Sequence, residues 1–197
     1  MVFLALVLFV AATRLVELRV SQRRRRALIG SGARAISETG FAGMVTLHVA
    51  VLAGAVIETL VFRRSVPVWF GLAAALGVLG AGALRVSAIR NLGEHWNVRI
   101  IDSTAFGVVT SGPYRFVRHP NYVAVFLELL LLPLVQGAWL TAALGAGLHV
   151  VVLRRRILLE EAVLFESSAY RAAMAHKPRF LPRLLPAAAF SVRTRKS

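Results

Sequence analysis

The sequence contains no cysteine, two lysines and only nine acidic residues in 197 positions. The absence of cysteine excludes disulfide bonds, thiolate catalysis and zinc–thiolate sites. The sequence has 24 basic residues, of which 22 are arginine, and its formal net charge is +15. Because the arginines lie at the ends of long apolar runs, we predict contact with anionic membrane lipids and no nucleic-acid partner.

Hydrophobic residues make up 57% of the chain, and the mean hydropathy is +0.69. Apolar runs of this length predict an all-α integral membrane protein with about five transmembrane helices. The stretch 123–153 is too long for one ordinary span, and LPLVQGAW at 132–139 interrupts it, which indicates a tight helical hairpin made by spans four and five. The other predicted spans cover 1–20, Phe41–Phe62 and 67–89, and RRRR at 23–26 is predicted to be a loop.

Arginines outside the spans fall mainly on one side of the predicted topology. That side holds the loop after the first span, the connector 90–122 and the tail from residue 154, and the positive-inside rule places it in the cytoplasm. The opposite side holds the N-terminus, Arg63, Arg64 and the uncharged hairpin tip. We therefore predict that the connector and the tail form one site at the cytoplasmic face.

The connector contains GPYRFVRHPNY at 112–122, which concentrates polar chemistry between apolar runs. Neither Pro113 nor Pro120 has a backbone N–H, and the residues before them are pushed toward extended geometry, so this stretch is predicted to be a loop around a ligand. In the tail, Arg156 and Glu160 are four residues apart and share a helix face. Arginines that only anchor the chain to headgroups, and a solvated Arg156–Glu160 pair, are the simpler alternatives.

Two motifs together resemble a known family. VTSGPYRFVRHPNY at 109–122, followed after the hydrophobic hairpin by RILLEE at 156–161, is similar to the isoprenylcysteine carboxyl methyltransferase family, including its bacterial and archaeal relatives. The resemblance covers residues 85–182 and implies an integral membrane enzyme with S-adenosylmethionine as cofactor. It divides the chain into N-terminal transmembrane helices (1–66) and a methyltransferase core (67–197).

The resemblance also implies roles for individual residues. Arg156 matches an arginine beside the acceptor carboxylate, and Arg85 matches an arginine needed for activity, so both are predicted to be catalytic. Glu160 joins them as a candidate general base, with His119 as the alternative. The predicted cofactor-binding residues are Val108, Val109, Tyr114, His119, Pro120, Asn121, Tyr122 and Glu161. No set of histidines and acids has metal-ligand spacing, so no metal site is predicted.

The predicted reaction, methyl transfer to an oxygen, does not identify the chemical class of the acceptor. A carboxylate is already ionised at neutral pH and needs only an orienting cation, whereas a phenol or enol must lose a proton. The short acidic motif is typical of prokaryotic members, so we predict a prokaryotic cytoplasmic membrane protein that acts on a lipophilic small molecule or a prenylated compound. Sideways entry of such an acceptor predicts an apolar gap between spans near His119. The alternatives are an NADPH-dependent membrane reductase with a related helical core and a non-catalytic membrane protein.

Overall fold

A computed structural model of the chain describes residues 2–38 and 40–182. The long helices there are α1 (Val2–Gly30), α2 (Phe41–Phe62), α3 (Val68–Leu92), α4 (Pro120–Leu134) and α5 (Trp139–Leu164), and α6 (Ser168–Met174) is short. Two-residue strands, β1 (Arg34–Ala35) and β2 (Ile101–Asp102), pair antiparallel. The connector adds the 3-10 helices Gly93–His95, Thr104–Phe106 and Gly112–Arg115. The prediction of a helical protein is confirmed, with the small β-ladder as an addition to it.

Within the described residues, two helices are long and apolar enough to cross a membrane, judged by length and composition: Phe41–Phe62 and Val68–His95. Their most apolar windows have mean hydropathies of 2.0 and 1.8. Helix α1 carries Arg14 and Glu17 within its apolar run, and the apolar part of α5 ends at Arg154. Helix α4 is apolar but only 15 residues long. The number of five spans therefore stays a prediction.

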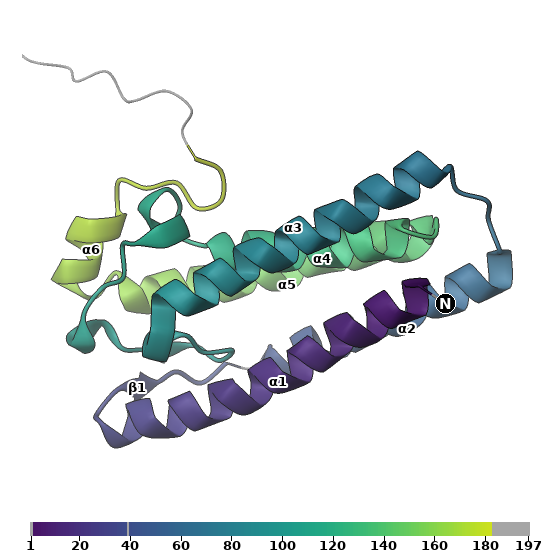
Figure 1. Cartoon of the computed structure of the whole chain (residues 1–197). Helices are drawn as coiled ribbons and strands as arrows, with labels where there is room; N and C mark the ends of the chain where they lie inside the picture. The colour runs from purple at the N-terminus through teal and green to yellow at the C-terminus, as the bar shows by residue number, and fades with distance from the viewer. Residues whose placement is uncertain (1, 39, 183–197) are drawn as a thin grey trace, which may run out of the picture.

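The polar segments gather at one end of the bundle. Figure 1 shows β1, the connector and α6 there, whereas the α2–α3 and α4–α5 links and the N-terminus lie at the opposite end. The predicted topology requires this arrangement in order to bring the connector and the tail together. The β-ladder, which pairs Arg34 with Asp102 and Ala35 with Ile101, ties the α1–α2 loop to the connector.

Several predicted boundaries are wrong. Helix α1 continues to Gly30, so RRRR at 23–26 is helical rather than a loop, in line with the high helix propensity of arginine. The predicted connector 90–122 is too long at both ends, because α3 runs into it and α4 begins at Pro120. Proline is favoured at this first helical position, where a backbone N–H has no partner within the helix. The stretch 112–115 is a 3-10 turn and not extended chain.

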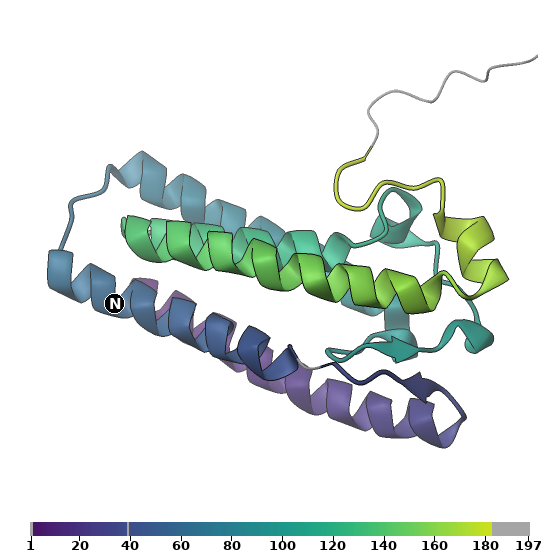
Figure 2. The ribbon, with the colours of Figure 1, turned by 180° about the vertical axis from the view of Figure 1, so that it is seen from behind.

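The predicted fifth span and the tail motif form one continuous helix. Helix α5 passes from the hairpin through RILLEE at 156–161 without a break, and Figure 2 shows it running on toward α6. The motif therefore stands on a rigid element, and part of the predicted tail is the end of this helix. The chain then returns to the connector, where Arg118 N donates to Pro178 O at 2.9 Å and His119 N donates to Arg179 O at 3.0 Å.

Small residues let helices α2 and α5 pack closely. Ala55 on α2 and Ala142 on α5 are fully buried, and Gly145 faces Val51 between the two helices. A Cβ added at Gly145 would lie 2.6 Å from Val51 Cγ2, closer than side chains normally approach. Because Val51 is β-branched and only 3% exposed, it has little freedom to move away.

We expect Gly145→Ala to lower the free energy of unfolding by about 1–3 kcal/mol, because the added methyl group overpacks this contact. The matched control is Gly147→Ala on the same helix, where nothing lies within 4 Å of an added Cβ. There, alanine is expected to stabilise the helix by about 0.5–1 kcal/mol. Thermal unfolding in detergent measures both changes. Equal melting temperatures for the two variants would contradict the α2–α5 contact.

Candidate functional site

A cavity of about 400 Å³ lies toward the polar end of the bundle and is bounded by the connector and by residues from all six helices. Its volume is in the range of small-molecule sites. The cavity is lined by most of the predicted site residues, from α3, the connector, α4 and α5: Arg85, Val108, Val109, Tyr114, His119, Asn121, Tyr122, Arg156 and Glu160. Pro120 and Glu161 are buried beside these residues without lining the cavity.

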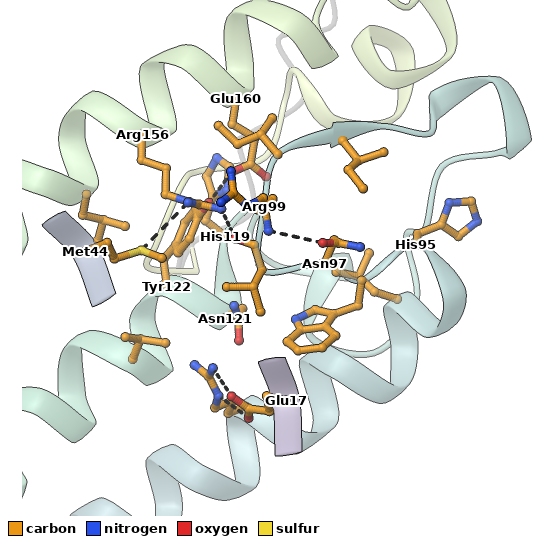
Figure 3. Close-up of a pocket in the computed structure, with 18 of the residues that line it drawn as sticks. Glu17, Met44, His95, Asn97, Arg99, His119, Asn121, Tyr122, Arg156 and Glu160 are labelled. Atoms are coloured by element: carbon orange, nitrogen blue, oxygen red, sulfur yellow. Dashed lines mark hydrogen bonds and ion pairs between the residues drawn. The ribbon is translucent and has the colours of Figure 1, made fainter. Parts of the chain in front are cut away.

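Tyr122 stands at the centre of the polar contacts. Its hydroxyl donates to Glu160 Oε2 and accepts from Arg156 Nε at 2.9 Å. Arg156 also donates from Nη2 to the Val98 carbonyl and from Nη1 to Glu38 Oε2, the latter at 2.7 Å. Figure 3 shows Arg156, Tyr122 and Glu160 directed toward one another. Arg156 and Glu160 thus approach each other as their spacing predicts, but they are joined through Tyr122.

Glu161 holds His119 rather than facing the cavity. Its Oε1 lies 3.0 Å from His119 Nε2, and Arg179 donates from Nη2 to its Oε2 at 2.6 Å. Burial by itself raises the pKa of the Glu161 carboxyl, but the hydrogen bonds from His119 and Arg179 outweigh burial and lower the pKa to about 2. With this carboxylate ionised, His119 Nε2 carries the proton, and its ring is held against Tyr122 with 5.3 Å between centroids. A contact between Glu161 and the cofactor stays a prediction.

One wall of the cavity is apolar. Tyr114 belongs to a buried cluster with Tyr170 and Met174, and Val108 and Val109 pack against that cluster. Burial raises the pKa of the Tyr114 hydroxyl, so this side chain stays neutral at physiological pH. Such a wall suits a flat, uncharged ring better than a charged group. The apolar wall is compatible with the predicted role of Tyr114, Val108 and Val109 in cofactor binding.

Inside the bundle, four charged residues form a neutral network. Arg85 donates from Nε to Glu17 Oε1 at 2.7 Å, and Arg14 binds both Glu17, at 2.8 Å, and Glu128. Arg85 lines the cavity, and its Nη1 is buried with no hydrogen-bond partner among residues 2–38 and 40–182. The resemblance points to Arg85 but gives no role to Arg14 or Glu17. Charged residues within an apolar span are functional candidates by default, and this rule identifies Arg14 and Glu17 from the sequence.

Two further residues of the site escape sequence analysis. Glu38 binds Arg156, which is 118 positions away, and Arg179 binds Glu161. Both lie in polar segments without motif or periodicity, so nothing in the sequence ties either residue to its partner. In the part of the chain that the structure describes, no three His, Asp or Glu side chains are grouped to hold a metal ion.

Residues 73–166 match the isoprenylcysteine carboxyl methyltransferase (ICMT) family. The chain is similar to the uncharacterized protein YpbQ of Bacillus subtilis, with 30% identity over 167 residues that cover 84% of this chain and 98% of that protein. It is also similar to an uncharacterized protein of Haemophilus influenzae, with 31% identity over 160 residues that cover 79% of this chain and 90% of the other. The family match spans Arg85, the connector and the RILLEE motif.

Proposed function

Because the chain belongs to the isoprenylcysteine carboxyl methyltransferase family, a family of membrane methyltransferases, we propose that it transfers a methyl group from S-adenosylmethionine to an oxygen of a lipophilic acceptor. The family match confirms the resemblance that the two motifs indicate. The observation that carries the proposal is the cavity, in which the connector motif and the tail motif meet at Tyr122.

The cavity offers polar atoms that fit S-adenosylmethionine. Asn121 Oδ1 is buried without a hydrogen-bond partner among the described residues, and an amino or hydroxyl group of the cofactor could donate to it. Arg118 Nε lies 3.4 Å from Glu161 Oε1 and makes no hydrogen bond within residues 2–38 and 40–182, so it can still bind a carboxylate. When bound, the cofactor supplies an electrophilic methyl group on a sulfonium. Val108 and Val109 would cover its ring from the apolar wall.

An apolar mouth supports a lipophilic acceptor. Leu15 of α1 and Val49 of α2 line the same cavity as His119, yet each is 60% exposed. Residues that are exposed and also line a cavity mark its opening, which here lies between two helices. An apolar opening at this position supports sideways entry of an acceptor from the bilayer. A small lipophilic molecule or a prenylated compound could follow this route, with membrane lipids around the protein.

Four polar side chains around the cavity can take part in the proposed methyl transfer. The acceptor oxygen must be placed about 3 Å from the methyl carbon while water is kept out. Arg156 lies beside Tyr122 at the predicted acceptor position, and Arg85 can bind the acceptor through Nη1, which has no hydrogen-bond partner among the described residues. Glu160 takes the proton if the acceptor is a phenol or enol, with His119 as the other candidate base. Since a carboxylate needs no base, these roles alone leave the acceptor class open.

We further propose a multi-pass protein of the prokaryotic cytoplasmic membrane whose polar end faces the cytoplasm. Two helices of membrane-spanning length and composition support this location. The positive-inside rule supports the orientation, because the connector end of the bundle carries the arginines at 23–26, 34, 99, 115 and 118.

Calorimetric titration of the detergent-purified protein with S-adenosylhomocysteine, and with NADPH in parallel, tests the function. We expect only S-adenosylhomocysteine to bind. Asn121→Ala should weaken its binding about tenfold, since one buried hydrogen bond is lost. Glu166→Ala, which alters an exposed surface pair, should leave it unchanged. Binding of NADPH alone would favour a membrane reductase, and binding of neither by a folded sample would favour a non-catalytic protein.

A further inference from the structure

Residues 34–38, which follow α1, lie against the connector and reach Arg156. Its strand β1 pairs with β2, and Ile36 N donates to Ile100 O at 3.2 Å. These contacts hold residues 34–38, which we call the strap, against the connector. Glu38, the last residue of the strap, thereby reaches Arg156 on α5 and binds it at 2.7 Å.

Each nitrogen of the Arg156 guanidinium already donates to an oxygen of the protein. Nε binds the Tyr122 hydroxyl, Nη2 binds the Val98 carbonyl, and Nη1 binds Glu38 Oε2. The side chains of Arg156 and Glu38 are only 9% and 4% exposed, so water does not weaken this ion pair much. Glu38 therefore occupies a position in which an acceptor carboxylate would pair with the guanidinium.

The charges around this pair also oppose a further anion. The Glu160 carboxylate accepts a hydrogen bond from Tyr122 beside the same guanidinium. Arg156 therefore lies near two carboxylates, those of Glu38 and Glu160. Arg99 lines the cavity, but its guanidinium lies over the Phe41 ring at 4.1 Å. Glu38 Oε1 is buried and has no hydrogen-bond partner among the described residues. At Arg156, an incoming carboxylate would therefore have to compete with Glu38 for the guanidinium.

We propose that Glu38 is a specificity-determining residue that keeps carboxylate acceptors away from Arg156 and leaves the site to acceptors that arrive uncharged, such as phenols and enols. This inference rests on the proposed function and deepens it, because it selects between the acceptor classes that the other residues leave open. It also gives the N-terminal part of the chain a role, since the strap supplies the carboxylate partner of Arg156. The arginine that the family resemblance places beside an acceptor carboxylate is, in this chain, already paired within the protein.

The test is the direct binding of dodecanoate to the protein in nanodiscs of neutral lipid, with empty nanodiscs subtracted. We expect Glu38→Ala to bind dodecanoate at least about tenfold more tightly than the wild type, because Arg156 regains free donors. Glu38→Gln keeps an acceptor for Arg156 and fills the same space, so it should fold normally and show a smaller gain. Adding Arg156→Ala to Glu38→Ala should remove the gain.

Glu166→Ala is the matched control, because Glu166 binds Arg34 of the strap at 2.6 Å on the surface and does not touch Arg156. Its affinity for dodecanoate should equal that of the wild type. Folded Glu38→Ala and Glu38→Gln proteins with no gain in dodecanoate affinity would overturn the proposal. Failure of the wild type to bind S-adenosylhomocysteine would count against the proposed function instead, and the dodecanoate comparison would still decide whether Glu38 shields Arg156.

Discussion

Replacement of Glu160 by glutamine is expected to slow methyl transfer to para-dodecylphenol by about 100- to 10,000-fold, the usual contribution of a positioned general base. A phenol has a pKa of about 10, so its proton must leave as the oxygen bonds to the methyl carbon. Glu160 lines the cavity and already accepts a hydrogen bond from the Tyr122 hydroxyl, so a proton acceptor is in place. Single-turnover transfer of a radiolabelled methyl group measures the rate.

Two further measurements separate this role of Glu160 from a structural one. Binding of S-adenosylhomocysteine by Glu160→Gln should be unchanged, because glutamine can still accept the hydrogen bond from Tyr122. The residual rate of the variant should rise steeply with pH, since phenolate formed in solution no longer needs a base. Glu166→Gln serves as the surface control. A wild-type rate in Glu160→Gln together with a large loss in His119→Ala would make His119 the base instead.

The predictable part of the site depends on short-range rules. Arg156 and Glu160 can be assigned to one face because helical spacing is local. Tyr122 and His119 can be predicted to lie near them, because the distribution of arginines predicts that the connector and the tail lie on one side of the membrane. Neither rule indicates that Tyr122 joins Arg156 to Glu160, or that Glu161 holds His119 instead of lining the cavity. Those are contacts between helices, and they depend on packing.

The parts that sequence analysis misses depend on long-range pairing or on weak local preferences. The strap is placed by a two-residue ladder between segments that have no strand pattern, so Glu38 carries no sign of its contact with Arg156. The first span is predicted to end at residue 20, before the arginines at 23–26, yet the long apolar stem of arginine allows the helix to continue through them. The sequence predicts that Pro120 belongs to a loop, whereas in the structure it is the first residue of α4. Proline is favoured at this position, although it disrupts a helix interior.

Loss of Arg85 is expected to lower the free energy of unfolding by about 3–5 kcal/mol, because the part-buried Glu17 carboxylate loses one of its two arginine partners. Arg85 makes two hydrogen bonds to Glu17, and Arg14 and Glu128 complete a network without net charge. Without Arg85, two carboxylates share one arginine in apolar surroundings. Chemical unfolding of detergent-purified Arg85→Met measures this loss, since methionine retains much of the apolar stem.

The decisive control is Arg85→Met combined with Glu17→Leu. Removal of both charges leaves the neutral Arg14–Glu128 pair, so the double variant should be more stable than either single variant, a strongly non-additive result. Arg90→Met, at an exposed position of the same helix, should change stability little. Additive losses would mean that Arg85 and Glu17 are not coupled. Because Arg85 also lines the cavity, a double variant that folds and binds S-adenosylhomocysteine but transfers no methyl group would separate its role in the site from its role in the fold.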